Sequence, residues 1–266
     1  MSGIARCALL VPLILIYGAP AMSAEAFSSP WAPGLKSSAR LIAGDQGWAG
    51  VEIKLASGTL TYWRDPGDAG LPPSFEFSGS INVAAPIILY PAPKRIREPD
   101  GSQALGYEGS VIFPFAVTRT NPDREASLTL KLNYAVCEKI CVPAEAKLTL
   151  TLPTQDGSLF AQAIAAARMA TPRQVDAASL GGELIAISDA SWRYCLAGPV
   201  VSRDLFIEPP QGWWIALKKE SVTDRDCFAL EAKQRPIDAN LPILVRVTIT
   251  GGDAPLETSV TLAAKP

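Results

Sequence analysis

Hydrophobic and polar residues alternate in short runs along most of the chain, and Gly, Pro and Asn separate these runs. Such runs predict half-buried β-strands, because successive side chains of a strand point to opposite faces of a sheet. Short strands with turn signals between them are typical of an antiparallel sandwich, so we predict an all-β fold. We assign residues 27–155 to a first domain. Its expected strands are 51–55, 60–63, 75–77, 82–90, 111–118, 128–136 and 146–152.

The period of the hydrophobic pattern changes near Asp156. Apolar residues recur at helical spacing through 158–170, and Thr171-Pro172 ends this run. This predicts one short helix in a linker of residues 156–173. Short alternating runs then return over 174–266 and predict a second, smaller β-domain. The strands expected there are 184–187, 192–196, 205–207, 214–217, 244–249 and 257–262.

The first 26 residues have the pattern of an export signal. Arg6 supplies a positive charge, residues 7–19 form an apolar run, and Ala24-Glu-Ala26 offers a small-residue cleavage site. Cleavage after Ser23 is the alternative. An apolar run of about 13 residues is too short for a membrane span, which needs roughly 20. We therefore expect removal of residues 1–26 and an extracytoplasmic location.

The composition limits the classes of function that the chain can have. It contains no histidine, which excludes Ser-His-Asp and Cys-His nucleophiles, histidine metal ligands and imidazole acid–base catalysis. The 24 Lys and Arg residues nearly balance 26 Asp and Glu, and the net charge of −2 argues against binding to a nucleic-acid backbone. We expect no cofactor, no metal ion and no nucleic-acid partner.

A pair of cysteines interrupts the longest alternating stretch of the chain. The runs 128–136 and 146–152 flank Cys137-Glu-Lys-Ile-Cys141, which predicts a hairpin with a cysteine on each side of a three-residue loop. Facing positions of two strands have Cα atoms about 4.5–5.5 Å apart, within the range that a disulfide accepts. This disulfide could therefore open and close without a large movement of the backbone.

Spacing alone leaves two interpretations of this pair open: a redox site and a structural disulfide. Bridging so short a loop adds less stability than the ~3 kcal/mol that the chain-entropy model assigns to a 15-residue loop. Lys139 would favour the thiolate form, whereas Glu138 would oppose it. Cys195 and Cys227 enclose a much longer loop among apolar residues, which favours a structural disulfide.

The residues around the first pair resemble a known family. The segment Tyr134-Ala-Val-Cys137-Glu-Lys-Ile-Cys141-Val-Pro143-Ala-Glu-Ala is similar to the cysteine segment in the periplasmic N-terminal region of DsbD-like proteins. The likeness is greatest to the suppressor of copper sensitivity B (ScsB) branch. Further similar stretches are 58–73, Tyr90-Pro-Ala-Pro93 and Gly106-Tyr107, so that the resemblance covers roughly residues 45–152.

The resemblance implies an immunoglobulin-like domain that transfers reducing equivalents by thiol–disulfide exchange. In this family electrons pass from a membrane-embedded domain to thioredoxin-like periplasmic proteins. The implied catalytic pair here is Cys137 and Cys141, one attacking a partner disulfide and the other resolving the mixed disulfide. Members can shield the cysteines with an aromatic cap loop. Tyr62 and Trp63 are candidates for that role, with core packing as the alternative.

The sequence departs from the family pattern in two ways. The cysteines are closer together than in the best-known members, so no redox potential is carried over. The sequence reaches Pro266 without a transmembrane or a thioredoxin-like segment, so we expect either a separately encoded membrane electron-transfer partner or the loss of the electron pathway with another role retained.

Two other functions stay open. The thiolates of Cys137 and Cys141 would suit Cu(I), a soft ion, although Met169 is the one methionine after the expected signal and no histidine completes a site. Alternatively, both disulfides are structural and the chain is a noncatalytic binding module. Trp213-Trp214 and the region of Arg95 and Arg97 would then be contact surfaces.

Overall fold

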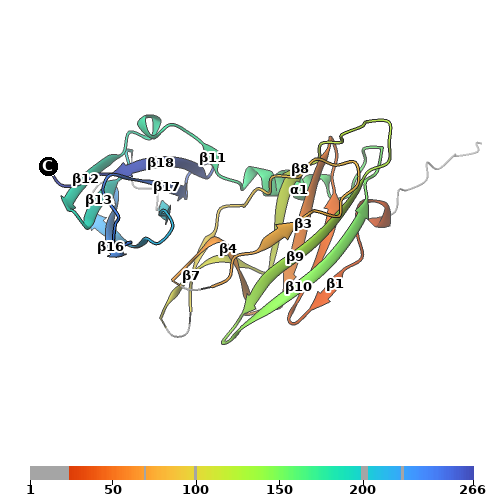
Figure 1. Cartoon of the computed structure of the whole chain (residues 1–266), viewed down its shortest axis with the longest axis horizontal. Helices are drawn as coiled ribbons and strands as arrows, with labels where there is room; N and C mark the ends of the chain where they lie inside the picture. Colours follow the sequence, from red (N-terminus) through yellow and green to blue (C-terminus); the bar gives the residue numbers. More distant parts are fainter. Residues whose placement is uncertain (1–23, 69, 99–100, 199–202, 223–224) are drawn as a thin grey trace, which may run out of the picture.

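The computed structural model describes residues 24–68, 70–98, 101–198, 203–222 and 225–266. Most of the expected export signal, residues 1–23, lies outside this part of the chain. Two β-sandwiches lie beside one another along the long axis of the molecule (Figure 1). Their strand pairs are antiparallel apart from one two-residue parallel pair, which confirms the all-β prediction. Within the described residues, no helix is long and apolar enough to cross a membrane.

The N-terminal sandwich contains a four-stranded and a six-stranded sheet that share one hydrophobic core. A short 3₁₀ helix, Ala24–Phe27, precedes it. The first sheet has the order β1 (Ala32–Gly34), β2 (Ser37–Ala43), β3 (Trp48–Leu55) and β8 (Ser110–Ala116). The second has the order β10 (Cys141–Thr151), β9 (Ser127–Cys137), β4 (Leu60–Gly67), β7 (Gln103–Glu108) and β6 (Lys94–Arg97), and β5 (Ser74–Glu76) pairs with β9.

The alternation of β9 shows how the sequence builds this core. Leu128, Leu130 and Leu132 are fully buried, whereas Lys131 between them is exposed. Each buried leucine removes enough apolar surface from water to contribute about 1.5–3 kcal/mol. A shift of β9 by one residue would turn all of these leucines toward solvent, so the hydrophobic pattern fixes the register of the strand.

The C-terminal sandwich is smaller and has its own hydrophobic core. One sheet has the order β11 (Arg173–Gln174), β18 (Leu256–Leu262), β17 (Ile243–Thr250) and β14 (Asp204–Glu208). The other has the order β12 (Glu183–Ser188), β13 (Ser191–Cys195), β16 (Arg225–Gln234) and β15 (Trp214–Val222), and a 3₁₀ helix, Ala177–Leu180, precedes β12.

A single α-helix, α1 (Ala161–Met169), connects the two sandwiches, as the change of hydrophobic period predicts. Its buried Ile164 packs against Gly44 and Gly50 of the N-terminal sandwich. The helix is therefore anchored to the first sandwich by one apolar side chain. The domain boundaries at residues 155 and 174 stay predictions.

One expected strand, residues 82–90, is wrong. Apart from an isolated bridge at Val83, this segment forms no ladder. Pro86 provides no N–H group for a ladder, and Pro91 and Pro93 follow directly. The apolar residues that suggest a strand have another use, because Ile88 and Tyr90 pack against the core of the first sandwich.

Side chains of β4 join the two sandwiches. The ring of Trp63 makes an edge contact with Phe206 at a centroid distance of 6.1 Å. The next residue, Arg64, forms two hydrogen bonds with Glu208 at 2.7 and 2.8 Å and an ion pair with Glu257. Arg95 on β6 adds a 3.2 Å ion pair with Asp204, which fixes the second sandwich to the same sheet.

Replacing Arg64 with methionine should destabilise the junction by about 3 kcal/mol, because the change leaves the buried carboxylate of Glu257 without its main cation. Urea unfolding monitored by tryptophan fluorescence measures this loss. The matched control is Arg193→Met, which removes an exposed ion pair with Glu220 and should cost no more than about 1 kcal/mol. Equal losses in the two variants would contradict a stabilising junction.

Candidate redox site

The cysteine hairpin is the end of the longest ladder in the molecule. β9 and β10 pair from Ser127 and Thr151 to Cys137 and Cys141, where the two cysteines face one another. A disulfide joins them, and their Cα atoms are 4.0 Å apart. Residues 138–140 form the loop between them, which is the hairpin that the sequence predicts.

The two cysteines differ sharply in exposure. Cys137 is 1% exposed and belongs to a small apolar cluster with Leu60 and Ala135, whereas Cys141 is exposed at the start of β10. Ile140, the loop residue before Cys141, is 78% exposed. A thiol from another protein can therefore approach Cys141 much more easily than Cys137.

Tyr62 on β4 contacts both sulfur atoms. Its hydroxyl oxygen lies 3.0 Å from Sγ of Cys137 and 3.1 Å from Sγ of Cys141. Because the sulfurs of a disulfide carry no hydrogen, the phenol is the donor. Burial raises the pKa of Tyr62, and the nearby carboxylate of Glu98 raises it further. The hydroxyl therefore keeps its proton at neutral pH.

Close backbone packing holds the Tyr62 ring in this position. Tyr62 pairs with Gly106 on β7, where an added Cβ would lie 2.1 Å from the carbonyl oxygen of Thr61. Gly70, in the loop after β4, has a φ of +139° and lies against the ring. A Cβ there would lie 2.4 Å from Cε1 of Tyr62. Gly106 thus allows β7 to lie against the backbone of β4 at Tyr62, and Gly70 allows the loop after β4 to lie against the ring.

The structure brings some of the predicted site residues together and separates others. Trp63, the other candidate for a cap, follows Tyr62 on the strand and points to the opposite face, into the core beside Phe206. Glu138 forms an ion pair with Lys36, and this hydrogen bond and charge lower the pKa of Glu138. The sequence gives no signal for the part that Lys36 plays.

A groove of about 220 Å³ lies beside the disulfide. Its apolar lining comes from the hairpin and from the turn after β1, and it includes the exposed residues Leu35 and Ile140. Its full lining is Leu35, Lys36, Thr59, Val136, Cys137, Glu138, Lys139, Ile140 and Val142. Lys139 thus lies at this groove and contributes a positive charge near the cysteines.

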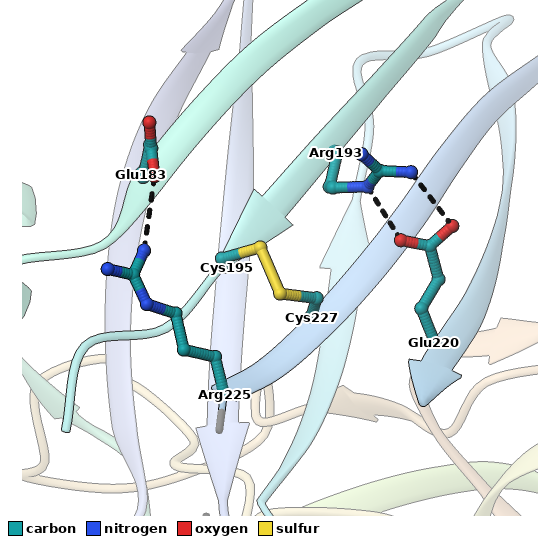
Figure 2. Close-up of a disulfide and its surroundings, with 6 residues drawn as sticks. All are labelled: Glu183, Arg193, Cys195, Glu220, Arg225 and Cys227. Atoms are coloured by element: carbon teal, nitrogen blue, oxygen red, sulfur yellow. Dashed lines mark hydrogen bonds and ion pairs between the residues drawn. A yellow bond between two sulfur atoms is a disulfide. The ribbon is translucent and has the colours of Figure 1, made fainter. Parts of the chain in front are cut away.

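The second disulfide joins Cys195 on β13 to Cys227 on β16, at facing positions of the ladder (Figure 2). Both cysteines are buried. Ion pairs lie on either side of the bond, Glu183 with Arg225 and Arg193 with Glu220, as Figure 2 shows. The predicted structural role of this pair is consistent with its burial within a sheet.

Asp226, next to Cys227, is buried with two cations. Burial opposes its charged form, but hydrogen bonds from Lys219 and Arg203 outweigh this, so the pKa of Asp226 is lowered.

Among the described residues, no group of three or more His, Cys, Asp or Glu side chains is arranged to hold a metal ion.

Residues 32–153 match the family model for the N-terminal region of the thiol:disulfide interchange protein DsbD. This segment resembles the DsbD N-terminal family, as the sequence indicates. It contains both cysteines of the hairpin and Tyr62, and the expected immunoglobulin-like fold of the first sandwich is borne out. A search of curated proteins gave no match.

Among solved structures, the N-terminal periplasmic domain of ScsB from Proteus mirabilis is similar, with a TM-score of 0.69 and 18% sequence identity. The match covers 90% of this chain and 99% of that one, so the shared fold extends beyond the DsbD segment into the second sandwich. The human desmocollin-1 ectodomain matches at a TM-score of 0.20 and 8% identity, over 93% of this chain and 52% of that one, which is too low to indicate a common fold.

Proposed function

We propose that this chain is a periplasmic thiol–disulfide interchange module in which Cys137 and Cys141 carry reducing equivalents to thioredoxin-like proteins. One observation carries the proposal: within a DsbD N-terminal segment, an exposed cysteine is bonded to a buried one at the tip of a hairpin. Such a bond is accessible to exchange, while the ladder behind it holds the two sulfurs in place.

We propose a role for each cysteine from the difference in their exposure. In the reduced protein the thiolate of Cys141 attacks a disulfide of the partner, forms a mixed disulfide and releases one partner thiolate. The thiolate of Cys137 then attacks the sulfur of Cys141. This step re-forms the internal disulfide and releases the second partner thiolate. Two electrons have then passed to the partner, and the pair must be reduced again.

The electron source for this cycle is a separate proposal. DsbD-type chemistry requires a donor of two electrons, and we propose a membrane-embedded domain that reduces the Cys137–Cys141 bond through the same mixed disulfide at Cys141. The periplasm, which is oxidising, is the compartment where such a donor is needed. The export-signal pattern at residues 1–26 supports this location.

The reduction potential of the Cys137–Cys141 pair tests the proposed function. We expect a value between about −120 and −270 mV, the range of exchange catalysts, whereas Cys195–Cys227 should lie below about −300 mV. Equilibration of the full chain with glutathione, followed by alkylation and mass spectrometry of the cysteine peptides, measures both pairs in one sample.

The second pair is thus an internal control for the first. If Cys137–Cys141 is as hard to reduce as Cys195–Cys227, the exchange function is excluded and a binding module with two structural disulfides is the better account. Tight stoichiometric binding of Cu(I) by the reduced pair would instead favour a role in copper handling.

A further inference from the structure

We propose that Tyr62 is a catalytic residue of this site, which stabilises the thiolate of Cys137 by donating a hydrogen bond to it whenever the disulfide opens. The proposal rests on the proposed exchange function and adds a residue to its chemistry. The carrying observation is the position of one buried hydroxyl within 3.0 and 3.1 Å of the two reacting sulfurs.

The role follows from where charge appears during exchange. When a thiolate attacks Sγ of Cys141, a bond forms between these two sulfurs, the Cys137–Cys141 bond breaks, and the electron pair leaves on Sγ of Cys137. This sulfur is buried in an apolar cluster, where an unpaired negative charge is costly. The hydroxyl of Tyr62 is the hydrogen-bond donor that lies next to Sγ of Cys137.

The same hydrogen bond also acts in the opposite direction. For Cys137 to resolve a mixed disulfide, its thiol must lose a proton, and a donor to the thiolate lowers the pKa of the thiol. The phenol itself keeps its proton, because burial and the charge of Glu98 raise the pKa of Tyr62. Tyr62 is therefore a hydrogen-bond donor throughout and not a proton carrier.

Among the described residues, no charged side chain forms a hydrogen bond with Sγ of Cys137. Lys36 is paired with Glu138 at the rim of the groove, and Lys139 lies in the exposed loop. Glu98, beyond β6, is negative and acts against a thiolate. Among the described residues, Tyr62 is the polar side chain with a hydrogen bond to Sγ of Cys137.

The substitution Tyr62→Phe removes the hydroxyl and keeps the ring against which Gly70 packs. The probe is dithiothreitol, and the readout is the rate at which it opens Cys137–Cys141 in the full chain, compared at equal concentrations of reagent thiolate. We expect Tyr62→Phe to slow opening by about three- to tenfold, because a leaving thiol with a higher pKa leaves more slowly. The matched control is Tyr134→Phe, which removes another buried hydroxyl, bonded to Ser37, and should leave the rate within about twofold.

A potential measurement separates this role from a structural one. At a pH above the pKa of Cys137, Tyr62→Phe should shift the equilibrium toward the disulfide by about tenfold, or about 30 mV. The shift should vanish at a pH well below this pKa, because a neutral thiol gains little from the donor. A variant that folds normally but shows the wild-type rate and potential overturns the proposal.

A measurement on the wild-type protein covers the case in which Tyr62→Phe does not fold. With ¹³C at tyrosine Cζ, the resonance of Tyr62 in the reduced protein should move as the pH is raised through the pKa of Cys137, while that of Tyr134 stays in place. A Tyr62 resonance whose chemical shift does not change during this titration contradicts the proposal. If the wild-type pair itself resists reduction, the proposed function has failed, whereas an active wild type with an indifferent Tyr62 refutes this inference alone.

Discussion

The variant Cys137→Ser should accumulate a stable mixed disulfide at Cys141, and Cys141→Ser should form one more slowly by a factor on the order of a hundred, because Cys137 is 1% exposed. With Cys137 replaced, no internal thiolate is left to resolve the mixed disulfide. The experiment incubates each reduced variant with an excess of oxidised glutathione, and quantifies the adducts by mass spectrometry under non-reducing conditions.

Both cysteine positions can accommodate serine, so the two variants can be compared directly. A serine at position 137 is smaller than cysteine and polar. The hydroxyl of Tyr62 lies 3.0 Å from Sγ of Cys137, so it can form a hydrogen bond with the serine hydroxyl that replaces this sulfur. A serine at position 141 is exposed. Neither substitution should therefore unfold the hairpin, and near-native thermal unfolding of both variants is the control.

The opposite ranking would reverse the assignment of the two cysteines. If Cys141→Ser captured glutathione faster than Cys137→Ser, the hairpin would have to open so that Cys137 becomes the attacking group. If neither variant formed an adduct, the pair would be a structural disulfide and the exchange function would be lost.

Much of the hairpin could be predicted from the sequence, because its determinants are local. The alternation of Leu128, Leu130 and Leu132 fixes which face of β9 is buried, and the spacing of Cys137 and Cys141 fixes the loop. The paired strands then require little more than the period-2 rule. The helix over 161–169 was predictable for the same reason.

The rest of the site depends on contacts between segments that are distant in the sequence. Whether Tyr62 or Trp63 faces the cysteines depends on the register of β4 against β7, and the first four residues of β4 are buried on both faces of the strand. The burial of Cys137 and exposure of Cys141 depend on the packing of β4 beside β9. These features cannot be predicted from the sequence and are seen only in the tertiary structure.

The junction between the sandwiches was also beyond the sequence. Arg64 and its partners Glu208 and Glu257 are separated by 144 and 193 residues, and single charged residues give no pattern. The error over residues 82–90 has the reverse cause: its apolar residues suggest a strand, although prolines prevent a ladder and Ile88 and Tyr90 pack against the core from a loop.

Removing the second disulfide, with Cys195→Ala and Cys227→Ala together, should lower the stability of the C-terminal sandwich by about 4 kcal/mol. The two cysteines are 32 positions apart, and the chain-entropy model gives roughly this loss for a loop of that length. Urea unfolding of the full chain, monitored by fluorescence of the buried Trp192 and Trp213, measures it.

The pair Cys137→Ala and Cys141→Ala is the matched control. Its cysteines are four positions apart, and the same model predicts a loss of only about 2 kcal/mol, confined to the N-terminal sandwich. A disulfide that opens in each catalytic cycle must not carry the stability of its domain, whereas one that never opens can do so. Equal losses, or a fluorescence transition that ignores Cys195 and Cys227, would remove this division between a redox pair and a structural pair.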